Sequence, residues 1–161
     1  MRILDPTCSA KSIWFDKNNP HVVHCDKRAG DYSESCSSYK GRNLVISPHV
    51  QLDFTALPFC DECFDMVVFD PPHYERLGNT SALAIRYGKL FPGWEDDIHA
   101  GFDECWRVLK TNGTLIFKWS VTDIPLKKVL ELAPPPLFGH TTGSNSQARW
   151  ITFVKFPIAP Q

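Results

Sequence analysis

The chain alternates short apolar blocks with polar stretches that contain proline or glycine. Such blocks predict β-strands, here at residues 2–5, 21–25, 64–69, 113–118 and 149–156, with a weaker one at 48–52. Apolar residues at helical spacing predict helices at residues 10–17, 95–109 and 125–132. Because strands alternate with helices, the pattern predicts an α/β domain with a mainly parallel, twisted sheet and helices on both faces.

The clearest predicted helix is 95–109, because Ile98, Phe102 and Cys105 fall on one of its faces. Glycine at position 113 is typical of the end of a helix, and the next strand follows at once. The sequence therefore predicts a helix that leads directly into a buried strand.

The last strand is predicted to form an antiparallel hairpin that closes the sheet, approached through Gly139–Gly143. His140 would then lie near the rim of a site or be an ordinary loop residue. Residues 27–47 and 75–94 show no clear period, so we expect loops or short irregular elements there.

The length of 161 residues and a hydrophobic content of 43% predict one domain, 1–161.

The formal charge of -1 provides no general attraction for polyanions, so contact with nucleic acid would need a local basic patch. No apolar run approaches the ~18 residues of a membrane span and no signal peptide is recognisable, so we expect a cytoplasmic protein without a membrane partner. The pattern does not predict an oligomeric state.

Six cysteines raise the question of a metal or disulfide site. Cys60 and Cys63 form a CxxC pair, but a structural zinc site needs two further ligands and the sequence has no second CxxC. We therefore expect reduced cysteines and no metal.

Four predicted strands end at or near an aspartate: Asp5, Asp26, Asp53 and Asp70. Open α/β sheets bind ligands at the carboxyl ends of their strands, so these carboxylates are expected to gather at one edge. Each one alone would more simply be a helix cap or turn residue. Asp26 lies 21 positions after Asp5, the spacing at which a βαβ unit places an acid on ribose hydroxyls. The turn after Asp5 has no glycine, so the pattern favours a nucleoside without a pyrophosphate.

Several segments, in order, resemble the motifs of class I S-adenosylmethionine-dependent methyltransferases: DPTCSAK, HCDKR, LDFTALPF, FDMVVFDPPH and VLKTNGTLIFK. DPPH resembles the [DNS]PP[YFWH] signature of the amino-methylating branch. The chain is also similar to small stand-alone methyltransferase-like proteins of phages and prophages. The resemblance implies a single Rossmann-like methyltransferase domain that binds S-adenosyl-L-methionine.

The same resemblance implies roles for individual residues. The implied cofactor-binding residues are Asp5, Thr7, Cys8, Ser9 and Lys11 around the methionine part, Asp26 and Lys27 at the ribose, and Asp53 and Phe54 at the adenine. The implied catalytic residues are Asp70, Pro71, Pro72 and His73. DNA methyltransferases of this branch usually have glycines where this chain has Ser9 and Lys11.

The DPPH corner suits methylation of an exocyclic amine. The nitrogen lone pair must point at the methyl donor, so the two N–H groups need acceptors, and Asp70 and the Pro71 carbonyl can provide them. Prolines fix the backbone and so preorganise that carbonyl. His73 is expected to stack on the flipped base, a role that Tyr74 could share.

The leading function is therefore methylation of adenine N6 in DNA or RNA, with cytosine less favoured. A protein glutamine amide or a small-molecule amine are alternative acceptors, and a non-catalytic cofactor-binding or regulatory domain is the alternative class. A local basic rim for nucleic acid would come from Lys40, Arg42, Arg76, Arg86, Lys89 and Arg149.

Overall fold

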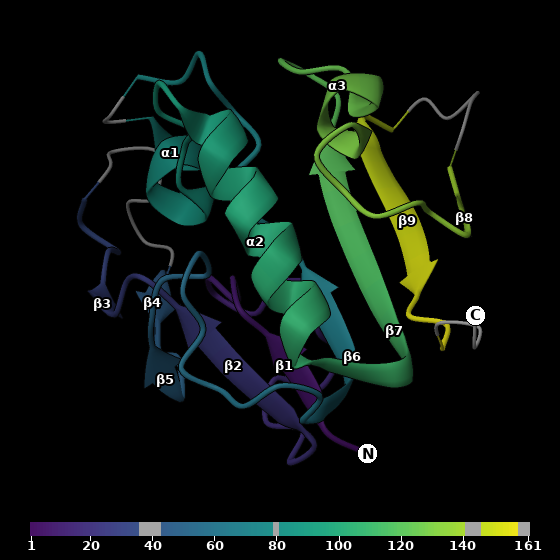
Figure 1. Ribbon diagram of the computed structural model, residues 1–161. Helices are drawn as coiled ribbons and strands as arrows, with labels where there is room; N and C mark the ends of the chain where they lie inside the picture. The colour runs from purple at the N-terminus through teal and green to yellow at the C-terminus, as the bar shows by residue number, and fades with distance from the viewer. Residues whose placement is uncertain (36–42, 79–80, 141–145, 158–161) are drawn as a thin grey trace.

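A seven-stranded sheet forms the centre of the computed structural model, which describes residues 1–35, 43–78, 81–140 and 146–157 (Figure 1). The strands in spatial order are β5 (Val50–Gln51), β2 (Val22–Asp26), β1 (Ile3–Asp5), β6 (Phe64–Phe69), β7 (Leu109–Ser120), β9 (Ala148–Val154) and β8 (Phe138–Gly139). The first five are parallel to one another, whereas β9 is antiparallel to β7 and to β8. The predicted mainly parallel sheet with an antiparallel end is confirmed.

The remaining elements are α1 (Ala82–Tyr87), α2 (Trp94–Val108), α3 (Leu126–Leu130) and a two-stranded antiparallel sheet of β3 (Gly30–Asp31) and β4 (Val45–Ile46). The two segments expected to be irregular thus contain a short hairpin sheet and a short helix. In the described part of the chain, no helix has the length and apolarity that crossing a membrane requires.

Helix α2 covers one face of the sheet (Figure 1). Three acidic residues lie in its first turn and Arg107 in its last, an arrangement that complements the helix dipole. Its buried Phe102 contacts Phe69 of β6 and Phe117 of β7, with ring centroids 5.5 and 4.9 Å apart. This aromatic packing fixes the ends of β6 and β7, where the candidate site lies.

The opposite face is covered by a segment of turns, so the predicted helix at 10–17 is wrong. Ser9 and Lys11 adopt left-handed φ angles of 47° and 54°, which a right-handed helix cannot continue. The indole of Trp14 donates a 2.6 Å hydrogen bond to Asp5 and holds the turns against the sheet. Ile13 and Trp14 pack on this face over a small buried cluster of Ile3, Val22 and Val68.

The chain order of the sheet reverses between β1 and β6. From β1 the chain proceeds to β2 and β5 on one side, and it returns through β6 and β7 on the other. A crevice forms outside the carboxyl ends at such a switch point. The Asp70 amide donates a 3.1 Å hydrogen bond to the Thr7 hydroxyl across this point, so the ends of β1 and β6 are tied together.

The described cysteines, Cys8, Cys25, Cys60, Cys63 and Cys105, are free thiols. Within the described ranges, no group of three or more His, Cys, Asp or Glu side chains has an arrangement that could hold a metal ion.

Gly101 of α2 lies close against the rings of Phe54 and of Phe69 in β6. A Cβ at this position would lie 2.7 Å from a ring carbon of Phe54 and 2.8 Å from one of Phe69. We expect Gly101→Ala to lower the free energy of unfolding by about 1–2 kcal/mol in denaturant titrations, because overpacking outweighs the helix preference of alanine. Gly78→Ala is the control, since a Cβ added at Gly78 would have nothing within 4 Å. Equal stability of Gly101→Ala and wild type would contradict this packing.

Candidate functional site

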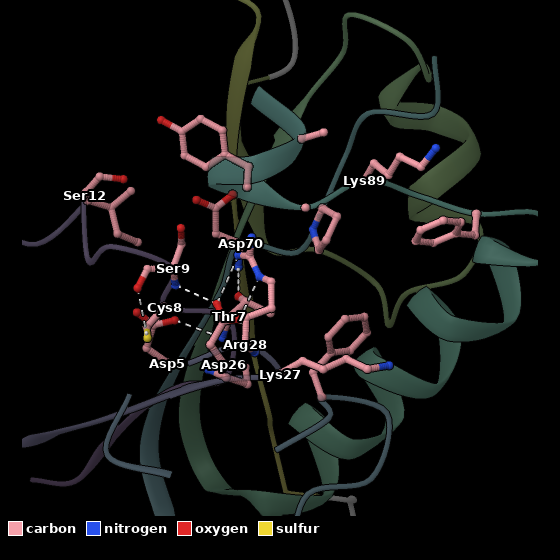
Figure 2. Close-up of a pocket in the computed structure, with 18 residues that line it drawn as sticks. Asp5, Thr7, Cys8, Ser9, Ser12, Asp26, Lys27, Arg28, Asp70 and Lys89 are labelled. Atoms are coloured by element: carbon pink, nitrogen blue, oxygen red, sulfur yellow. Dashed lines mark hydrogen bonds and ion pairs between the residues drawn. The ribbon is translucent and has the colours of Figure 1, made fainter. Parts of the chain in front are cut away.

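A cavity of about 370 Å³ opens at the carboxyl ends of β1, β2 and β6 (Figure 2). Its volume lies in the range of small-molecule sites. Ser9 and Ser12 lie on one side of the cavity and Lys89 lies on the other, while Asp26 and Asp70 lie between them. The fold thus brings three of the four predicted strand-end carboxylates, those of Asp5, Asp26 and Asp70, to one cavity.

A smaller cavity of about 160 Å³ shares part of this lining. Lys27, Phe54 and Pro72 belong to both cavities, and the smaller one adds Asp53. The fourth strand-end carboxylate is therefore adjacent to the other three, in its own compartment.

The turn after β1 adopts the backbone conformation that glycine would supply. Ser9 and Lys11 both have left-handed φ angles, and non-glycine residues adopt this region at a cost. The Ser9 amide donates a 2.8 Å hydrogen bond to Asp26, and the Cys8 amide donates a 2.7 Å bond to the Cys25 carbonyl. These bonds hold the turn without glycines.

Asp26 is buried, and both of its oxygens are occupied. One accepts from the Arg28 amide at 2.9 Å and from the Arg28 Nε at 3.2 Å, and the other accepts from Ser9. Arg28 also donates to the carbonyls of Ile85 and Arg86 in α1, at 2.8 and 3.3 Å. Hydroxyls of a bound ribose would therefore have to replace contacts of Arg28, a residue that sequence reasoning missed.

Helix α1 contributes to the cavity wall, although none of its side chains is buried. Besides Arg28, the Ser9 hydroxyl donates a 2.5 Å hydrogen bond to the Arg86 carbonyl. The last carbonyls of a helix lack partners within the helix, so these donors satisfy them. Polar contacts at its C-terminal end thus attach α1 to the turn and to β2.

Lys27 and Asp53 form an ion pair at 2.6 Å in the smaller cavity. Burial alone would raise the pKa of Asp53, but hydrogen bonds from Lys27 and Thr55 hold it below its ordinary value. The neighbouring Phe54 packs against Phe69, with ring centroids 5.4 Å apart. The structure thus places both residues predicted to meet adenine in one compartment, with Asp53 ionised.

Asp5 is buried beneath the main cavity. Its carboxylate accepts hydrogen bonds from Trp14 at 2.6 Å and from the Thr7 amide at 3.2 Å, and His24 Nδ1 lies 3.4 Å away. Burial raises the pKa of Asp5 despite these partners. Burial also raises the pKa of the Cys8 thiol, with Asp5 adding to the effect, so Cys8 lines the site as a neutral thiol.

The two oxygens of the Asp70 carboxylate differ: Oδ2 accepts a hydrogen bond, whereas Oδ1 lies 3.8 Å from His73 Nδ1, too far for one. Lys118 Nζ donates a 2.7 Å hydrogen bond to Oδ2. Oδ1 is buried and has no hydrogen-bond partner among the described residues. The two side chains are 12% and 17% exposed, so water screens the pair little. Asp70 is therefore a mostly buried, oriented acceptor on the cavity wall (Figure 2).

Sequence reasoning missed Lys118. Phe117 of β7 pairs with Phe69, the last residue of β6. The residues that follow them, Lys118 and Asp70, therefore lie side by side. The sequence does contain a signal for this residue, because Lys118 is the single lysine in the otherwise apolar run TLIFKW. Its ammonium also lies 5.9 Å from the ring centroid of Trp150.

His73 does not have the open ring face that stacking on a base requires. It is 5% exposed and packs between Tyr74 and Trp119, with centroids 4.6 and 5.9 Å away. Burial lowers the pKa of His73, so the ring is neutral at neutral pH. Its Nδ1 lies 3.1 Å from the Pro71 carbonyl oxygen, which can only accept, so Nδ1 carries the hydrogen. His73 thus anchors the corner, and our expected stacking role does not fit its burial.

The predicted basic rim is only partly described. Arg86 and Lys89 lie in the segment that forms the cavity edge, whereas Lys40 and Arg42 lie outside the described residues. Of the predicted hairpin approach, residues 141–143 also lie outside them. His140 is exposed, and its amide donates to the Trp150 carbonyl at 3.0 Å, so its role stays a prediction.

No protein-family model and no curated protein matches this sequence. Solved structures do match the fold. A TehB-like SAM-dependent methyltransferase from Corynebacterium glutamicum matches with a TM-score of 0.58 and 15% identity, over 96% of this chain and 79% of that chain. The N-methyltransferase NodS from Bradyrhizobium japonicum has a TM-score of 0.55 and 14% identity, over 97% and 86%.

A third match is a 16S rRNA N2 methyltransferase of T. thermophilus in complex with AdoMet and guanosine. Its TM-score is 0.53 at 15% identity, over 99% of this chain and 36% of that chain. At these identities the likeness establishes the fold, which is the Rossmann-like fold of SAM-dependent methyltransferases.

Arg28 should control how firmly α1 is attached. We expect Arg28→Ala to accelerate hydrogen exchange of the Ile85 and Gly88 amides by about ten-fold or more, because hydrogen bonds from a charged group are lost. Lys27→Ala is the matched control, since its ammonium pairs with Asp53. Unchanged exchange in α1 would show that other contacts hold the helix.

Proposed function

We propose that this protein transfers a methyl group from S-adenosyl-L-methionine to an exocyclic amine, with adenine N6 in DNA or RNA as the acceptor. The observation that carries the proposal is Asp70, whose Oδ1 is a buried acceptor without a partner among the described residues, on the wall of a cavity. A group that donates N–H bonds is the natural complement of such an oxygen.

The residues present fit the cofactor. The main cavity lies at the topological switch point, and buried carboxylates line it, which suits a ligand that carries a sulfonium and an ammonium group. Asp5 and the left-handed turn from Thr7 to Lys11 would hold the methionine part. Asp26 would hold the ribose in exchange for contacts with Arg28, and the smaller cavity with Asp53 and Phe54 would hold the adenine.

When bound, the cofactor supplies an electrophilic methyl group. Asp70 accepts one N–H of the acceptor amine through Oδ1, while Lys118 holds Oδ2 and so fixes the direction of the carboxylate. The Pro71 carbonyl has two lone pairs, one directed to His73, so it can accept the second N–H. These contacts turn the nitrogen lone pair out of conjugation and hold it in one direction. Orientation of this kind is worth up to ~7–11 kcal/mol in well-aligned systems.

A regulatory domain without catalysis is the second candidate function. The arrangement that favours it is Arg28, which occupies the Asp26 carboxylate that a ribose would need. Titration calorimetry with S-adenosyl-L-methionine separates the two, because a domain that keeps Arg28 in place would show no binding heat.

Asp70 can be tested directly. We expect Asp70→Ala to lower methyl transfer by about a hundred-fold or more and to leave cofactor affinity nearly unchanged, because the carboxylate contacts the acceptor. Tritiated-methyl transfer into DNA, RNA and protein pools measures the first quantity, and calorimetry measures the second. Asp65→Ala is the matched control, because Asp65 forms a similar 2.8 Å pair with Lys110 at the other end of the same two strands. An Asp70→Ala protein that still transfers methyl groups would remove Asp70 from the mechanism.

Lys118 provides a separate prediction. Lys118→Met should lower kcat by about ten-fold or more with little change in KM, because Asp70 keeps its place but loses its fixed direction. Lys118→Arg should recover part of kcat, since arginine can donate to the same oxygen. Steady-state kinetics below the melting temperature of each variant measures this. If Lys118→Met lowers the melting temperature but leaves kcat unchanged, Lys118 has a structural role only.

A further inference from the structure

Two aromatic side chains with adjacent cations lie along the edge of the cavities, directly after α1. The Arg86 guanidinium carbon lies 5.3 Å from the ring centroid of Tyr87, and Lys89 Nζ lies 5.0 Å from that of Phe91. Tyr87 lines the main cavity, and Lys89 and Phe91 line both cavities. We call these four residues the cation–aromatic rim.

The rim is partly exposed, although Arg86 Nε is buried and has no hydrogen-bond partner among the described residues. Phe91 is 61% exposed, and Tyr87 is partly exposed. Within the described part of the chain, neither Arg86 nor Lys89 forms an ion pair, whereas Arg28, which lines the main cavity, pairs with Asp26. The rim therefore offers two rings that are at least partly exposed, each with a cation beside it, and two positive charges without an ion-pair partner among the described residues.

This combination matches the needs of a nucleic acid strand. Bases stack on aromatic rings, and phosphates pair with adjacent cations, whatever the sequence. A glutamine side chain or a small amine would need the Asp70 corner but would leave both rings unused. Asp97 also lines the smaller cavity and would repel phosphates there, so the favoured backbone path crosses Arg86 and Tyr87.

The depth of Asp70 distinguishes a single strand from a duplex. Its side chain is 12% exposed, so a base reaches it only after leaving its stack. Extraction from a duplex costs unpairing and unstacking energy, whereas a base in a single strand is already unpaired. The rim spans only residues 86–91, a short surface that one strand can follow. His73 is buried, so the rings of the rim provide another stacking surface near the corner, where the ring centroid of Tyr87 lies 6.4 Å from that of His73.

We propose that the cation–aromatic rim binds single-stranded nucleic acid, with Tyr87 and Phe91 stacking on bases and Arg86 and Lys89 contacting phosphates. The inference rests on the proposed function in one respect: that function requires one base of the strand to enter the cavity. Strand binding itself is measurable without methyl transfer.

The experiment measures fluorescence anisotropy of a dye-labelled, adenine-containing oligonucleotide of about 12 nucleotides, as DNA and as RNA, single-stranded and as duplex. We expect the single strands to bind at least ten-fold more tightly than the duplexes. Phe91→Leu and Tyr87→Leu should each weaken strand binding by about ten-fold, because leucine keeps apolar volume but has no π face, and Phe91→Trp should retain binding. Lys89→Gln should reduce the salt dependence of binding.

Phe138→Leu is the matched control, because Phe138 is 64% exposed on β8 and lines neither cavity. Absence of strand binding, equal affinity for duplex, or wild-type affinity in both Phe91→Leu and Tyr87→Leu would each overturn the inference. A protein that binds strands but never methylates them supports the rim and refutes the proposed transfer. A protein that methylates a glutamine peptide or a small amine and binds no strand refutes the rim and leaves amine methylation standing.

Discussion

The carboxylate of Asp26 organises the cavity wall. It accepts the Ser9 amide, which stabilises a left-handed turn that contains no glycine, and it binds Arg28, which in turn reaches the last carbonyls of α1. One buried group thereby joins the ends of two strands and a helix that has no buried side chain. Substitution of Asp26 would therefore disturb the turn, the arginine and the helix together, and its effect on any ligand would combine all three.

The three carboxylates of the main cavity have different partners. Asp5 is held by neutral donors and is buried, Asp26 is matched by an arginine, and Asp70 is matched by a lysine at only one of its oxygens. Most of the negative charge that the strand ends gather is thus balanced within the protein. Oδ1 of Asp70 is the carboxylate oxygen of this cavity that is buried without a hydrogen-bond partner among the described residues.

Local pattern was sufficient for the sheet and for α2. Residues 64–69 form the predicted strand, and residues 94–108 form the helix expected at 95–109, because alternation and helical spacing report burial directly. The prediction failed at 10–17, where Lys11 has a left-handed angle, as does the preceding Ser9, whose amide donates to Asp26. Arg28 and Lys118 were missed because their partners in α1 and β6 depend on tertiary register.

The absence of buried side chains in α1 has a consequence for how this protein can diversify. Changes in residues 82–87 and in the adjoining rim leave the aromatic core under α2 intact, so they carry little risk to folding. The fold thus separates a closely packed core from a short helix that lines the cavity and contributes no residue to that core. Selection or design aimed at a new ligand has a natural place to act: a short helix attached by its backbone carbonyls, none of whose residues is fully buried.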